Sequence, residues 1–175
     1  MIKDSGNRTE FESGAVRDIQ EGKGRCDLLP LDVVCRIYSD SGKKDEAEIF
    51  WAIRLFMNDG QHKHLLAALD AFLELHPDWG FCVETMLLEV SIHFEEGAKK
   101  YGERNWEKGI PTERYINSAL RHLLKCMRGD DDEPHDRAFC WNLMCCIWTC
   151  MNHPEQNSYP IKQEGVDAFG REKEQ

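Results

Sequence analysis

The chain has 175 residues, of which 41% are hydrophobic, and it carries a formal net charge of −10. This length suits one domain with a substantial core, because domains of about this size bury roughly 70% of the surface that the unfolded chain exposes. The acidic balance argues against a nucleic-acid polymer as partner, since binding one needs a basic face, and no apolar run approaches the roughly 20 residues of a membrane span.

Apolar residues recur at helical spacing, and we find no convincing strand-like alternation. Ile49, Ala52, Ile53 and Phe56, for example, fall on one side of a helix. The predicted helices cover residues 31–39, 44–58, 62–75 and 82–100, then a stretch from Pro111 to Arg128, and a last one that opens in the Asp130–Pro134 segment and reaches about Met151.

This pattern predicts an all-α fold, a single-domain bundle of about five to six helices over residues 14–153. Residues 1–13 and 154–175 lack apolar periodicity and are predicted to be flexible tails. The eight cysteines include no CxxC pair of the kind that binds zinc, and the polar N-terminus does not resemble a signal peptide. We therefore expect reduced cysteines that pack as small hydrophobes in a cytoplasmic protein.

Two acidic groups could hold a metal ion. Glu89, His93 and Glu96 share one face of the helix predicted over 82–100, and Glu133 and Asp136 are three residues apart in the last helix. Carboxylates from two facing helices suit Mg²⁺, which prefers oxygen ligands. The first group could equally be a solvated face, and the second could serve the N-terminal dipole of a helix.

The run from Gly97 to Pro111 follows the first acidic group directly and combines cations with aromatic rings. Such a segment can supply cations for phosphates and aromatic surfaces for a base. Asn105 can donate and accept at a base edge, and Trp106 can stack on it; alternatively, Asn105 caps a turn and Trp106 fills the bundle. The candidate binding residues of this run are Lys99, Lys100, Tyr101, Arg104, Asn105 and Trp106.

The N-terminal segment 14–30 places Arg17, Lys23 and Arg25 around two glycines. It does not match the GxxxxGK[ST] pattern of a phosphate-binding P-loop, and a lone Gly-Lys-Gly is weak evidence. We interpret it as an arm that folds over a triphosphate.

Four segments together, 14–30, 97–111, ALRHL at 119–123 and Trp141-Asn142, resemble the phage dATP/dGTP diphosphohydrolase family, an all-helical relative of the MazG-type nucleotide pyrophosphatases. The resemblance implies hydrolysis of dGTP or dATP to the monophosphate and pyrophosphate, with Mg²⁺, or Mn²⁺ in its place, as cofactor. It also implies a homo-oligomer in the host cytoplasm, with Arg121 on phosphate and Asn142 in the nucleotide site.

The MazG-type metal motif, ExxE followed by ExxD, is matched only in its second half, by Glu133 and Asp136. No literal ExxE precedes, so Glu89 and Glu96 would replace it. The predicted metal ligands are Glu89, Glu96, Glu133 and Asp136, and the predicted catalytic residues are Glu96, Glu133, Asp136 and His135.

Two other functions stay open. His135-Asp136 is a literal pair of the HD-domain phosphohydrolases, although that fold needs a later aspartate and only Asp167 follows. The chain could also be a non-catalytic helical module that binds a nucleotide or a protein.

Overall fold

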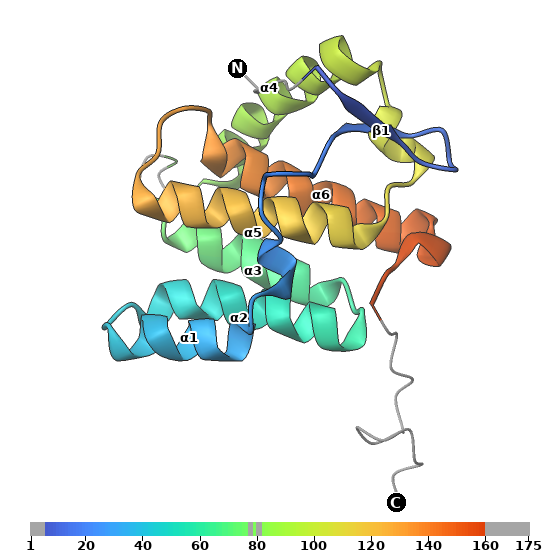
Figure 1. Ribbon diagram of the computed structural model, residues 1–175. Helices are drawn as coiled ribbons and strands as arrows, with labels where there is room; N and C mark the ends of the chain where they lie inside the picture. Colours follow the sequence, from blue (N-terminus) through green and yellow to red (C-terminus); the bar gives the residue numbers. More distant parts are fainter. Residues whose placement is uncertain (1–5, 77–78, 80–81, 160–175) are drawn as a thin grey trace, which may run out of the picture.

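The computed structural model of the chain describes residues 6–76, 79 and 82–159, and most of these residues are helical (Figure 1). The helices are α1 (Leu31–Asp40), α2 (Lys44–Asp59), α3 (Lys63–Glu74), α4 (Val83–Tyr101), α5 (Thr112–Arg128) and α6 (His135–Asn152), joined by the short 3₁₀ turns η1 (Cys26–Leu28), η3 (Asn105–Lys108) and η4 (Pro154–Gln156). The predicted all-α fold is confirmed. Each helix begins and ends within about one residue of its expected bounds, a difference no larger than the fraying of a helix end.

Helices α5 and α6 form the centre of the fold as an adjacent pair (Figure 1). Helix α4 packs on α6, while α1, α2 and α3 form a layer that reaches the centre mainly through α3. The core runs through both parts and includes the fully buried rings of Phe50, Phe56, Tyr115 and Phe139. Burial of such large apolar side chains, at about 1.5–3 kcal/mol each, is the main stabilising contribution to this arrangement.

A short hairpin precedes the helices and was not expected from the sequence. Strands β1 (Arg8–Glu10) and β2 (Val16–Asp18) pair in antiparallel fashion, with Thr9 opposite Arg17. Three residues are too few to show an alternating pattern, which is why our expectation of no strand was wrong. The β1 strand lies within the stretch 1–13 that we predicted to be a tail.

The chain after α6 is also packed where the structure describes it. The ring of Tyr159 lies 5.2 Å from that of Phe56 in an edge-to-face arrangement, and the Asn157 side chain donates a hydrogen bond to the Gly60 carbonyl. Residues 154–159 therefore join the body of the domain, while residues 160–175 lie outside the described part. Among the described residues, none of the helices has both the length and the apolar character that crossing a bilayer demands.

Candidate functional site

A cavity of about 780 Å³ lies between α4, α5, α6 and the N-terminal arm, which we define as residues 14–29. Helix α5 contributes one face at intervals of three or four residues, from Arg114 through Ser118 to Arg121, His122 and Lys125. The aromatic side chains Phe94, Tyr101, Trp106 and Trp141 line the same cavity. The cavity thus combines cations with aromatic rings, and its volume falls in the range of small-molecule sites, about 300–1,000 Å³.

Two asparagines fasten the backbone of the arm to the helical body. The Asn105 carboxamide accepts a hydrogen bond from the Val16 N–H at 2.9 Å and donates one to the Val16 carbonyl at 2.7 Å. The Asn117 carboxamide accepts from the Cys26 N–H at 2.6 Å and donates to the Gly24 carbonyl at 3.3 Å. The amide of Asn105, which we expected to read a base, is therefore occupied by the arm.

Arg17 enters the cavity from the arm. Its guanidinium lies 4.9 Å from the ring centre of Tyr115 and 5.6 Å from that of Trp141, and Nη2 donates a hydrogen bond to the Asn142 side chain. Nη1 is buried without a hydrogen-bond partner in the described structure. Burial lowers the pKa of this guanidinium below its usual value. A buried N–H donor without an acceptor is costly, so this group is suited to meet a ligand.

Arg17 is the centre of a cationic group that also contains Arg114 and Arg121. Burial, followed by the charge of Arg17, lowers the pKa of both neighbouring guanidinium groups. Arg121 donates a hydrogen bond to the Ser118 hydroxyl at 2.8 Å, and Arg114 lies over the ring of Phe11. Within the described residues no carboxylate forms an ion pair with any of the three. Their mutual repulsion would be relieved by an anion, and guanidinium groups fit phosphate well.

Four of the other predicted cations have carboxylate partners in their own segments. Lys23 pairs with Asp18, and the Arg25 Nε donates to Asp27 at 2.8 Å. The exposed Lys99 and Arg104 pair with Glu95 and Glu107. Of the predicted nucleotide-binding residues, those that line the cavity are Arg17, Lys23, Lys100, Tyr101, Arg104, Asn105, Trp106, Arg121 and Asn142; Arg25 and Lys99 do not.

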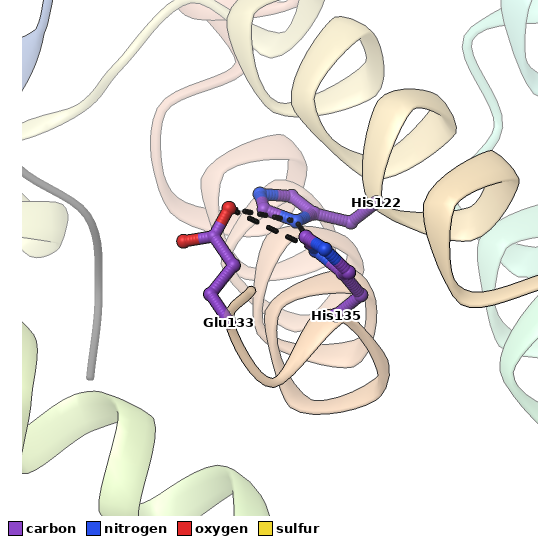
Figure 2. A group of neighbouring side chains, drawn as sticks. All are labelled: His122, Glu133 and His135. Carbon is purple, nitrogen blue, oxygen red and sulfur yellow. Dashed lines mark hydrogen bonds and ion pairs between the residues drawn. The ribbon is translucent and has the colours of Figure 1, made fainter. Parts of the chain in front are cut away.

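At the end of the cavity near Lys125, two histidines and a glutamate come together (Figure 2). The Nδ1 atoms of His122 and His135 are 2.9 Å apart, and the Glu133 Oε1 lies 3.8 Å from the first and 3.7 Å from the second. The His135 Nε2 lies 2.7 Å from the Asp132 Oδ1. Both imidazoles are buried, and burial, followed by the charge of Arg121, holds the pKa of His122 well below its usual value.

The remaining predicted ligands lie elsewhere. Asp136 lies 3.5 Å from the His76 Nε2, and Glu89 lies 3.8 Å from an Arg137 nitrogen. Neither they nor Glu96 belong to a group of three potential ligands in the described part of the chain, whereas Glu133 does. The structure therefore gathers two histidines around one of the four predicted carboxylates.

His93 lies in the wall of the same cavity, with its ring 5.5 Å from that of Trp141 and its Nδ1 buried without a partner in the described structure. Burial, reinforced by the charges of Arg137 and Arg17, lowers its pKa from 6.5 to about 3. The imidazole is therefore neutral in the folded protein at neutral pH.

Acidification is expected to destabilise the fold through His93. Below pH 6.5 the unfolded chain binds a proton at this residue, whereas the folded protein binds it only near pH 3. The free energy of unfolding therefore decreases as the pH is lowered from 6.5 toward 3. The loss from this group between pH 7 and pH 5 is about 2 kcal/mol. Urea unfolding of the wild type and of His93→Gln at both pH values measures it, and an unchanged pH dependence in the variant would contradict the assignment.

The sequence alone did not reveal His122, Arg114 or Asn117 as parts of the site. Their signal is the spacing along α5, where 114, 117, 118, 121, 122 and 125 share one face. His122 and His135 meet because α5 and α6 form an antiparallel pair joined by a short connection. A lone histidine in a helix is more often a structural residue than a ligand, so the sequence gives no reason to single out His122.

The fold and the site define an all-α protein that presents a buried cationic cavity beside a cluster of potential metal ligands. A model of the family described as dATP/dGTP diphosphohydrolase, N-terminal, matches residues 72–159, just over half of the chain. The chain therefore belongs to this family, which confirms the resemblance. No curated protein and no solved structure matches it. The family description implies an enzyme that acts on a nucleoside triphosphate with a divalent metal ion.

Proposed function

We propose that the protein hydrolyses dGTP or dATP to the nucleoside monophosphate and pyrophosphate. The observation that carries this proposal is the group of Arg17, Arg114 and Arg121, which share one cavity with His122 and Glu133 and have no carboxylate ion-pair partner among the described residues. A triphosphate supplies the missing negative charge, and the family description supplies the base preference.

Different residues of the cavity would bind different parts of the substrate. The arginines would bind the phosphates and stabilise charge that develops on their oxygens as water attacks the α-phosphorus. A divalent ion, Mg²⁺ or Mn²⁺, would supply Lewis-acid character and lower the pKa of bound water. Trp106, whose ring lies edge-to-face with Phe94 and Trp148, would form one wall of the base site together with Tyr101.

Several sequence-based assignments stay proposals. Of the four predicted metal ligands, Glu133 lines the cavity. We keep as predictions the ligand roles of Glu89, Glu96 and Asp136 and the catalytic role of His135. The same holds for the homo-oligomer, the cytoplasmic location and the domain bounds of 14–153.

The products of dGTP hydrolysis test the proposed function. Incubation with dGTP and Mg²⁺ or Mn²⁺ is expected to release pyrophosphate and dGMP. An HD-type enzyme would release tripolyphosphate instead, and a binding module would release neither. Against the HD-type reading, Asp136 lies beside His76 and takes no part in the His122–His135 cluster, while Asp167 lies outside the described residues.

Removal of divalent ions is expected to stop turnover without unfolding the protein. The core of the bundle is apolar and does not depend on the acidic residues, so the helical circular-dichroism signal should persist in EDTA. Activity assays and thermal melts on the same EDTA-treated sample provide the measurement. If EDTA melts the helices, the metal is structural and the catalytic role proposed for it is wrong.

A further inference from the structure

We propose that His122, Glu133 and His135 bind a first-row transition-metal ion of the Zn²⁺ type rather than Mg²⁺. The proposal rests on the proposed function and adds a second ion to it. The Mg²⁺ or Mn²⁺ ion named there would enter with the triphosphate, whereas this ion would bind protein ligands at one end of the cavity. The proposal can be tested without turnover, so the two can fail separately.

The positions of the three donor atoms fit such an ion. Ligand atoms bound about 2.0–2.1 Å from a tetrahedral Zn²⁺ ion lie about 3.3 Å from one another. The separations of 2.9, 3.8 and 3.7 Å between these three donor atoms bracket that value. Figure 2 shows Glu133 pointing toward the gap between the two imidazoles. One ion could therefore bind all three groups after the two imidazoles separate and Glu133 moves inward, each by a few tenths of an ångström.

The nitrogen and oxygen donors of this cluster favour one class of metal ion over another. Mg²⁺ prefers oxygen ligands and keeps several waters, whereas imidazole nitrogen favours Zn²⁺ and its neighbours among the divalent ions. Two histidines and one carboxylate form a donor set found in catalytic zinc sites, with further positions left for water or substrate. Here His122 and Glu133 line the cavity, so those positions would face the proposed triphosphate site.

Asp132 fixes the orientation of the His135 imidazole before any metal ion binds. Because the His135 Nε2 lies 2.7 Å from the Asp132 carboxylate, this nitrogen carries the proton and donates it, which leaves the Nδ1 lone pair directed at His122. Carboxylate–histidine–metal arrangements of this kind raise ligand basicity and hold the ring in place. Without metal, the His122 Nδ1–H can donate to His135; a shift of that proton to Nε2 would free the second lone pair without any change in charge.

Titration of the whole metal-free protein with Co²⁺ tests the site, because the weak d–d absorption of aqueous Co²⁺ becomes stronger and shifts when imidazole and carboxylate ligands replace water. The wild type is expected to bind a single ion with such a spectrum, which Zn²⁺ displaces and excess Mg²⁺ does not. Glu133→Gln and His122→Ala are expected to abolish the spectrum, and Asp132→Asn is expected to weaken binding by about 10- to 100-fold. His64→Gln, which alters a half-buried histidine paired with Asp59, is the matched control and should bind as the wild type does.

Each result decides one proposal. The inference would be overturned if the wild type gave only the weak spectrum of aqueous Co²⁺, if Mg²⁺ displaced the bound ion, or if Glu133→Gln kept an undiminished spectrum. Glu133→Gln changes a half-buried residue and is therefore the safer variant for folding. Circular dichroism on each variant separates loss of binding from loss of fold. Pyrophosphate release without Co²⁺ binding would leave the proposed function intact, and Co²⁺ binding without dGTP hydrolysis would overturn the function alone.

Discussion

Replacing Glu133 with glutamine is expected to lower kcat for dGTP by about a thousandfold, which corresponds to about 4 kcal/mol of transition-state stabilisation. Glu133 is the one carboxylate among the three proposed metal ligands His122, Glu133 and His135, and its Oε1 lies within 4 Å of both imidazole Nδ1 atoms. The variant keeps the shape of the side chain but removes that charge. Nucleotide affinity should change little, because the arginines remain.

The matched control is Glu103→Gln, which neutralises another carboxylate of the same cavity in an exposed position on its rim. It is expected to keep kcat within about twofold of the wild type, since an exposed charge is screened by solvent. Steady-state kinetics at saturating divalent ion provide the measurement. Equal losses in both variants would mean that general electrostatics, rather than metal binding at Glu133, governs the rate.

The helices could be predicted from the sequence because each one has local signals. Residues 44–59 show apolar spacing of three and four, and the helix ends at Gly60, whose φ of 70° lies in the left-handed region that glycine adopts freely. The β1–β2 hairpin lacked such signals, since each strand has three residues and its stability depends on distant groups such as Asn105.

The candidate site could be predicted only in part because helical periodicity tells which residues share a face but not what that face meets. Glu89 and Glu96 do share a face of α4, yet the structure places Arg137, and not Glu133, beside Glu89. Conversely, no local pattern distinguishes His122 from an ordinary helical histidine. Its role depends on the packing of α5 against α6, which brings His135 to 2.9 Å, and no local pattern encodes that distance.

Replacing Arg17 with methionine is expected to lower kcat/KM for every nucleoside triphosphate by about 100-fold, or about 3 kcal/mol. The Arg17 guanidinium is buried, offers an unpartnered Nη1 within the described structure, and lies next to Arg114 and Arg121. Methionine keeps apolar contact with Tyr115 and Trp141 but cannot donate to a phosphate. All bases should be affected alike, because the proposed contact is with the phosphates.

The stability of the Arg17→Met variant should separate a binding role from a structural one. Loss of the hydrogen bond to Asn142 lowers the free energy of unfolding, whereas removal of a buried cation that Arg114 and Arg121 repel raises it. The net change should therefore be no more than about 1 kcal/mol. Tripolyphosphate should raise the Tm of the wild type and of the exposed control Arg36→Met, because an anion that binds only the folded state stabilises it. It should raise the Tm of Arg17→Met far less. If tripolyphosphate stabilised Arg17→Met as much as the wild type, the cavity would bind anions without Arg17, and the arm would serve only to cover it.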